Sequence, residues 1–264
     1  MTSEQQKSTE WSDQWKMFQD DHHFLFLDWI KPFTLESFEG KRVLECGCGG
    51  GHHTQIMASK AKHVTAVDLN TVQIAKERCA DFTNISFVEA DLSAMNLKDQ
   101  FDIVVCIGVI HHTDDPDQVF NRLYEHLVPG GKLIIWTYSA EGNSLVQYAV
   151  EPIRKIFLLK ISRQTLLWIS RFVTMLLYPF VYTVYTVPFF KWLPYWKYFG
   201  NFRKLTFERN VLNVFDKLNA PQTKFTTLSK CKQWMSEEKF VPKSITINSY
   251  VDVSWTLTGT KKEN

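Results

Sequence analysis

The chain has 264 residues, 45% of them hydrophobic and 22% charged, with a formal net charge of +2 at pH 7. This length and apolar content allow one sizeable core, or a core with an elaborated cap, and exclude a largely disordered chain. Its five cysteines are irregularly placed and odd in number, which argues against a disulfide framework and for a reducing compartment. The polar segment Met1–Glu10 lacks a hydrophobic signal region, so we expect a cytoplasmic protein.

A glycine-rich loop follows the first predicted strand. The run 41–44 leads into Glu45-Cys46-Gly47-Cys48-Gly49-Gly50-Gly51, and a helical stretch begins near Thr54. Strand, glycine turn and helix in this order let the backbone approach a ligand at the carboxyl end of a parallel strand. The dinucleotide fingerprint would need glycine at position 52, where the chain has histidine. The remaining pattern, E-x-G-x-G-x-G, predicts a nucleotide-cofactor loop.

Two further predicted strands end in acidic residues. The first, 63–67, is followed by Asp68-Leu69-Asn70, and the second, 85–88, is followed by Glu89-Ala90-Asp91-Leu92. A carboxylate at a strand end can accept hydrogen bonds from both hydroxyls of a ribose. Asp68 is therefore a candidate ribose ligand.

The chain then continues the alternation of strands and helices. We expect a strand over 101–107 closed by Gly108, a helix over 116–127, and a fifth strand over 132–138 after the turn Pro129-Gly130-Gly131. A helix over 228–239, with Thr227 as N-cap, precedes strands near 244–248 and 254–260. Short apolar runs alternating with helical patterns are typical of a parallel sheet covered on both faces.

Over about residues 40–140, these motifs resemble the class I S-adenosylmethionine-dependent methyltransferases. The resemblance is to the broad small-molecule group whose fourth strand runs into a segment such as Gly108-Val109-Ile110-His111-His112. It implies an α/β fold, a Rossmann-like, mostly parallel sheet of seven strands with helices on both faces, its last strand antiparallel and inserted at the edge. It also implies that S-adenosylmethionine is the cofactor, with the acid of the third strand on the adenine amino group and apolar neighbours sandwiching the ring. The cofactor-binding residues expected on this basis are Glu45, Gly47, Cys48, Gly49, Gly51, Asp68, Leu69, Asp91, Leu92 and Ile107.

Two histidines follow the fourth strand and are the candidate catalytic residues. A hydroxyl acceptor needs a base near pH 7, and histidine supplies one most simply. His111 and His112 lie just past the strand end, although the alternative that they only shape the loop stays open. Asp114 and Asp115 are too close in a turn to converge on one metal ion with them, and Asp115-Pro116 suits a helix entry. We therefore predict no metal site.

The segment 142–225 differs in composition from the rest of the chain. It holds twelve basic residues against three acidic ones, and 19 of the 38 aromatic residues. We expect a helical cap inserted after the fifth strand. Its uncharged stretch, 172–190, is nineteen residues long but contains Pro179 and Pro188, which we expect to break a helix, so we predict that it does not span a membrane. Its rings and flanking cations fit either the core of a cap or a membrane interface.

The predicted organisation has four parts. An N-terminal helical segment (1–39) precedes the cofactor-binding core (40–141), the cap (142–225) and the C-terminal part of the sheet (226–264). By resemblance, a helix carrying Trp11, Trp15 and Phe18 could lie over the cofactor, although core packing explains the same spacing.

The predicted reaction is methyl transfer to a small or amphiphilic acceptor at oxygen, such as a lipid-linked, quinone-like or saccharide precursor. The cap could also contact the inner face of an anionic membrane peripherally. An RNA methyltransferase is one alternative, because basic and aromatic residues alternate in the cap. The chain lacks the Asn/Asp-Pro-Pro-aromatic motif of base-amino methyltransferases, so nucleic acid is not the favoured partner. A membrane-docking, cofactor-binding protein without catalysis is the other alternative.

Overall fold

The sheet has the seven strands that the family resemblance implied. The computed structural model describes residues 11–18 and 23–263, so the predicted polar segment Met1–Glu10 lies outside the described residues. The strand order is β3-β2-β1-β4-β5-β7-β6. β7 runs antiparallel between β5 and β6, which confirms the Rossmann-like sheet with an inserted, reversed last strand. The strands are β1 (Arg42–Cys46), β2 (His63–Asp68), β3 (Ile85–Glu89), β4 (Phe101–Ile107), β5 (Leu127–Tyr138), β6 (Thr246–Tyr250) and β7 (Ser254–Thr260).

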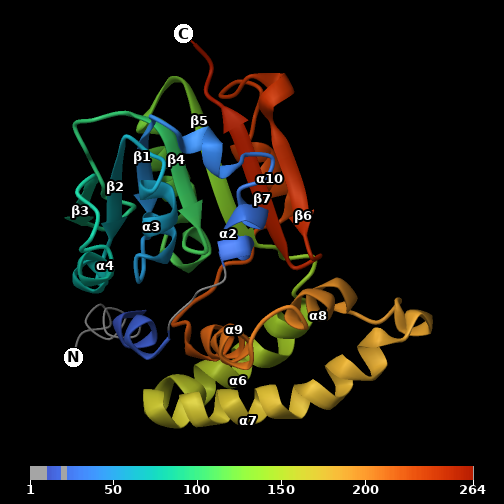
Figure 1. Cartoon of the computed structure of the whole chain (residues 1–264). Helices are drawn as coiled ribbons and strands as arrows, with labels where there is room; N and C mark the ends of the chain where they lie inside the picture. Colours follow the sequence, from blue (N-terminus) through green and yellow to red (C-terminus); the bar gives the residue numbers. More distant parts are fainter. Residues whose placement is uncertain (1–10, 19–22, 264) are drawn as a thin grey trace.

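Helices cover both faces of the sheet, and a separate group lies beyond one of its ends (Figure 1). Residues 11–17 are also helical. Around the sheet are α2 (His23–Trp29), η1 (Leu35–Phe38), α3 (His52–Ala58), α4 (Val72–Arg78), η2 (Ile110–His112), α5 (Pro116–Glu125), α10 (Leu228–Trp234) and η7 (Pro242–Ser244). The group beyond the sheet comprises η3 (Val146–Val150), α6 (Glu151–Ile156), η4 (Leu158–Lys160), α7 (Arg163–Tyr182), η5 (Val184–Thr186), η6 (Pro188–Phe190), α8 (Trp196–Phe202) and α9 (Phe207–Asn219).

Two elements differ most in extent from the sequence prediction, whereas α5 and β6 differ from it by two residues at an end. β5 begins at Leu127, ahead of the Pro-Gly-Gly turn, because Phe101 pairs with Leu127 and the register shifts before Ile103 pairs with Lys132. The expected turn is therefore an irregularity inside one strand, of the kind a bulge produces. α10 starts as predicted, with Thr227 Oγ1 accepting a hydrogen bond from the Lys230 amide. It ends at Trp234, because the backbone of the next residue leaves helical geometry.

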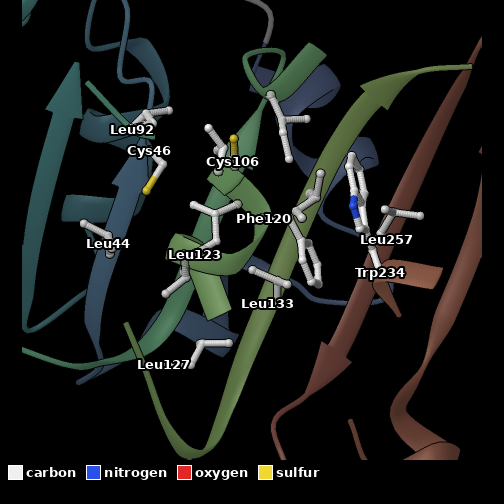
Figure 2. Close-up of a cluster of buried hydrophobic side chains, with 14 of the residues drawn as sticks. Leu44, Cys46, Leu92, Cys106, Phe120, Leu123, Leu127, Leu133, Trp234 and Leu257 are labelled. Carbon is white, nitrogen blue, oxygen red and sulfur yellow. The ribbon is translucent and has the colours of Figure 1, made fainter. Parts of the chain in front are cut away.

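Each face of the sheet has its own apolar layer. On one face, side chains of α5 and α10 pack on the strands (Figure 2). Phe120 and Trp234 stack there with ring centroids 5.3 Å apart. On the other face, α2 and α3 pack on the sheet, and Trp29 lies 4.9 Å from Trp136. All five cysteines are buried free thiols, in agreement with the prediction that they form no disulfide framework.

The cap has a small core of its own. α7 packs on α9 through buried apolar side chains, including Leu166, Val211 and Phe215. Phe18, which follows the N-terminal helix, joins this cluster at 5.3 Å from Phe215. The N-terminal segment is therefore attached to the cap as well as to the sheet.

The prediction that Pro179 breaks the helix is wrong. α7 continues through this residue to Tyr182 and ends there. Proline has no N–H to donate to the Met175 carbonyl oxygen, but its own carbonyl accepts from the Thr183 amide at 3.0 Å, so the last turn still forms. Among the described residues, α7 is the one helix long and apolar enough to cross a membrane by length and composition, with a hydropathy of 1.3 and 28% of that stretch buried.

A buried carboxyl group connects the first strand to the helix that follows it. Glu45, near the end of β1, is 3% exposed, and its Oε2 accepts a hydrogen bond from Thr54 Oγ1 at 2.5 Å. Burial raises the pKa of Glu45 to about 8, the Thr54 bond opposes this shift, and the negative charge of Asp68 adds to it. Glu45 is therefore largely protonated at neutral pH in the folded protein.

We predict that Glu45→Gln removes a pH dependence of stability. Because the folded-state pKa, about 8, lies above the ordinary value of 4.5, the wild type loses stability as pH rises from about 4.5 to 8. The glutamine variant should match the wild type near pH 5 and exceed its free energy of unfolding by on the order of 3 kcal/mol near pH 8.5. Urea unfolding of the cofactor-free protein at several pH values measures this difference. Exposed Glu39→Gln is the control, and equal pH slopes in wild type and Glu45→Gln would contradict the prediction.

Candidate active site

A cavity of about 280 Å³ lies at the carboxyl ends of the parallel strands. Its walls come from the loops after β1, β2, β3 and β4, from the N-terminal helix, and from α9 of the cap. Open α/β sheets bind ligands at this end of their strands. The cavity is therefore the candidate active site, between sheet and cap.

The glycine loop forms the floor of this cavity. Gly47 and Gly49 have φ values of 85° and 53°, the left-handed region that favours glycine. A Cβ on Gly47 would come within 2.2 Å of Val109 Cγ2, so only glycine fits at this point. The Gly49 amide donates a hydrogen bond to Asp68 Oδ2 at 2.9 Å. This bond connects the loop after β1 to the end of β2.

Most of the predicted cofactor-binding residues line the cavity together. They are Gly47, Cys48, Gly49, Asp68, Leu69, Asp91, Leu92 and Ile107. They supply two carboxylates and three apolar side chains, the chemistry that a ribose and an adenine ring require. Thr71 also lines the cavity, and its hydroxyl is buried with no hydrogen-bond partner. An orphaned hydroxyl of this kind fits a polar ligand, so the residues present suit an adenosyl group.

Three predicted site residues lie outside the cavity wall. Glu45 lies beneath the loop, paired with Thr54. Gly51 is the N-cap of α3, where a Cβ would come within 3.0 Å of the Ala75 backbone, so this glycine permits close helix packing. His111 is 1% exposed and lies behind its neighbour, against the Tyr138 ring at 4.3 Å.

The N-terminal helix covers the cavity. Trp11, Gln14 and Trp15 contribute to its wall. The Trp15 indole lies against the glycine loop, since a Cβ on Gly49 would come within 2.8 Å of its Nε1. Trp11 lies 4.8 Å from the His112 ring. The structure thus places this segment over the loop, the arrangement suggested by the family resemblance.

His112 lines the cavity in a defined orientation. Its Nδ1 lies 2.8 Å from the Gln222 carbonyl oxygen, and a carbonyl can only accept, so Nδ1 carries the proton. Nε2 then keeps its lone pair. Burial lowers the pKa of His112, although Asp216 and the Gln222 bond act in the opposite direction. The imidazole is therefore neutral near pH 7 and able to take up a proton.

The second histidine has different surroundings. His111 Nδ1 lies 3.2 Å from Thr137 Oγ1, and its Nε2 is buried with no hydrogen-bond partner. Burial holds the pKa of His111 well below its ordinary value, and the neighbouring His112 adds to this effect. Of the two candidate bases, only His112 reaches the cavity wall.

A carboxylate of the cap completes this side of the cavity. Tyr138 Oη donates to Asp216 Oδ2 at 2.9 Å, and Gln14 Nε2 donates to Asp216 Oδ1 at 3.3 Å. Burial, followed by the Asp216 charge, raises the pKa of Tyr138 well above its ordinary value, so the phenol stays protonated. Asp216 thus connects β5, the N-terminal helix and α9 around the cavity.

Sequence reasoning missed these residues of the cap and two indole donors. Arg209, Asn213, Asp216 and Gln222 line the cavity, yet they lie far along the chain from every recognised motif. One signal was available, because Asp216 is one of three acids among the twelve basic residues of 142–225. Trp29 and Trp136 also line the cavity, and each has a buried indole N–H without a partner. Nothing in their sequence pattern distinguishes them from core tryptophans.

Comparisons with known proteins agree with this geometry. Residues 44–135 match the family described as "Methyltransferase domain". A ubiquinone biosynthesis O-methyltransferase of Pseudomonas entomophila is 31% identical over 134 residues, which cover 48% of this chain and 57% of that protein. An uncharacterized protein of Synechococcus sp. is 35% identical over 122 residues, covering 42% of this chain and 29% of the relative. The chain thus spans little more than half the length of these relatives, or less.

A solved structure resembles the whole chain. The N-methyltransferase NodS of Bradyrhizobium japonicum, in complex with S-adenosyl-L-homocysteine, aligns over 98% of both chains with a TM-score of 0.50 and 12% identity. This likeness shows the fold. The family match, which covers the strands and loops of the cavity floor, identifies residues 44–135 as a methyltransferase domain, in line with the S-adenosylmethionine-dependent class that the sequence motifs resemble.

Proposed function

We propose that the protein transfers a methyl group from S-adenosylmethionine to a small or amphiphilic acceptor, at an oxygen atom. The observation that carries the proposal is that His112 lines the cavity as a neutral imidazole whose Nδ1 proton is bonded to the Gln222 carbonyl, which leaves a lone pair on Nε2. The methyltransferase domain supports the choice of cofactor. The proposed class of acceptor and the proposed methylated atom are inferred from the residues that line the cavity.

The residues that would hold the cofactor follow from the floor of the cavity. Asp68 would bind the ribose hydroxyls, Asp91 the adenine amino group, and Leu69, Leu92 and Ile107 the faces of the ring. When bound, S-adenosylmethionine supplies an electrophilic methyl group that already carries its leaving group. The chain's own contribution is then to align the acceptor, exclude water and remove a proton.

The walls near His112 suit an acceptor with both apolar and oxygen-bearing parts. The Trp11, Trp29 and Trp136 rings offer apolar surface. The two buried indole N–H groups of Trp29 and Trp136 can donate to a carbonyl, hydroxyl or carboxylate oxygen. Quinone-like and lipid-linked compounds combine these features. The similarity to proteins named for O-methylation in ubiquinone biosynthesis favours the same class.

The role of each group follows from its protonation state. His112 Nε2 would accept the proton of an acceptor hydroxyl as the new carbon–oxygen bond forms. The bond to Gln222 fixes the ring in the tautomer that this requires. Trp11 and Trp15 cover the cavity and would exclude water from the reacting atoms. Asp216 and Tyr138 are positioning residues, because each holds the other in the wall.

We predict that S-adenosylmethionine raises the melting temperature and that Asp68→Ala abolishes the increase. A ligand present at about 100 times its Kd stabilises the folded state by roughly 2.7 kcal/mol. Asp68 is the proposed ribose ligand, and its carboxylate also accepts a hydrogen bond from the Gly49 amide of the glycine loop. Differential scanning fluorimetry measures the shift. Exposed Asp81→Ala should respond as the wild type does. Absence of any shift with well-folded wild type would refute the proposed cofactor.

We also predict that His112→Ala lowers turnover of an oxygen acceptor by about 10²–10⁴-fold, the usual contribution of a general base. Its melting-temperature response to S-adenosylmethionine should remain. Because burial lowers the pKa of His112, the acid limb of the wild-type kcat profile should lie below pH 6.5, and the variant should lack it. Exposed His23→Ala is the control. Unchanged turnover in His112→Ala would exclude this base and favour an amine acceptor, which can react as the free base.

A further inference from the structure

The outer side of α7 is an apolar surface exposed to solvent. α7 buries one stripe of side chains against the rest of the cap, including Leu166, Ser170 and Thr174. A second stripe, spaced by three and four residues, lies on the opposite side of the helix. Each of its five large apolar side chains is between 54% and 62% exposed: Trp168, Phe172, Met175, Leu176 and Phe180.

The exposed surface continues past the end of α7. In the segment that follows, Phe189 and Trp192 are 77% and 73% exposed. We call these two residues and the five on α7 the outer patch. Figure 1 shows α7 along the edge of the molecule farthest from the sheet, with this segment at its end. Contiguous exposed apolar surface of this kind marks an interaction site in a folded protein.

The charge around the outer patch is mostly positive, and the acidic side chain beside it, Glu208, is paired with Arg171 at 3.3 Å. Residues 142–206 contain nine basic residues and a single acidic one, Glu151. That carboxylate is 14% exposed and pairs with Arg154 and Lys155, so it adds little negative charge to the surface. Lys160 and Lys191 are exposed near the two ends of the patch, and the Arg171 guanidinium lies 5.6 Å from the Trp168 ring.

We propose that the outer patch docks the protein on the surface of an anionic phospholipid bilayer. Tryptophan and phenylalanine insert at the boundary between headgroups and acyl chains, and lysine and arginine bind anionic headgroups. The excess of basic over acidic residues in 142–206 matches such a surface. Docking is peripheral, because the opposite face of α7 packs on α9 and includes the buried hydroxyls of Ser170 and Thr174.

This docking would bring the candidate active site close to lipid. α7 packs on α9, and α9 contributes Arg209, Leu212, Asn213 and Asp216 to the cavity wall. One helix therefore separates the docked surface from the cavity. The docking proposal stands without the proposed methyl transfer, since it rests on the outer surface alone.

The test is binding of the full-length chain to vesicles. Flotation with vesicles of equal parts phosphatidylglycerol and phosphatidylcholine should recover the protein at low salt, and binding should fall with added salt. Vesicles of phosphatidylcholine alone should bind at least tenfold less protein. The variant Phe172→Ser/Phe189→Ser/Trp192→Ser should lose at least tenfold in affinity. The matched control, Leu27→Ser/Val241→Ser, changes exposed apolar residues outside the cap and should bind as the wild type does.

Each of the following results would overturn the proposal. Absence of wild-type binding to anionic vesicles at low salt would do so, as would equal binding by the patch variant. Resistance of bound protein to carbonate extraction would indicate a spanning helix. Sedimentation showing a dimer that the patch substitutions dissociate, without vesicle binding, would identify a second copy as the occupant. A cooperative melting transition of the patch variant without cofactor, at a temperature close to that of the wild type, shows that it is folded and keeps this test independent of that of the cofactor.

Discussion

The hydrogen bond from the Gly49 amide to the Asp68 carboxylate holds together the part of the structure on which the rest of the site depends. It joins the loop after β1 to the end of β2. The second carboxylate oxygen accepts from the Asn70 amide at 3.2 Å, so both oxygens help to shape the cavity floor. The left-handed backbone of Gly49 makes this approach possible, and Trp15 then packs on the loop. The glycine loop around Gly49 therefore forms the floor of the cavity, holds Asp68 in place and supports Trp15, which covers the cavity.

The cap is organised around α9 in a similar way. One side of this helix packs on α7 and Phe18, and other residues of the same helix reach the cavity. Asp216 accepts hydrogen bonds from β5 and from the N-terminal helix, so three distant parts of the chain converge on one carboxylate. Within the cap, buried Arg154 of α6 holds α9 in place by donating to the Lys217 carbonyl oxygen and to Thr223 Oγ1. The Asp216 bonds thus connect the cap to the sheet, and the Arg154 bonds connect α6 to α9 inside the cap.

The sheet could be predicted from sequence because its signals are local. An apolar run, a glycine turn and an acid at a strand end lie within a few residues of one another, and β4 was predicted to the residue. The ends of β5 and α10 and the course of α7 past Pro179 could not be predicted, since pairing and packing with distant segments decide them. The same applies to Asp216 and Gln222. They reach the cavity only because the cap folds back over β5. No local sequence pattern predicts this arrangement of the cap.

The two neighbouring histidines have different surroundings because the 3-10 turn directs their side chains apart. His111 points into packing against Tyr138, where its Nδ1 meets a threonine hydroxyl, whereas His112 lies under Trp11 in the cavity wall. Because the two side chains follow each other in a 3-10 turn, they diverge by roughly a third of a turn. From the sequence, either histidine could be the base. The geometry of the turn places only His112 in the cavity wall. The reciprocal bonds between His112 and Gln222 then fix one tautomer, so the base proposed for catalysis depends on a residue that enters the site from the far end of the cap.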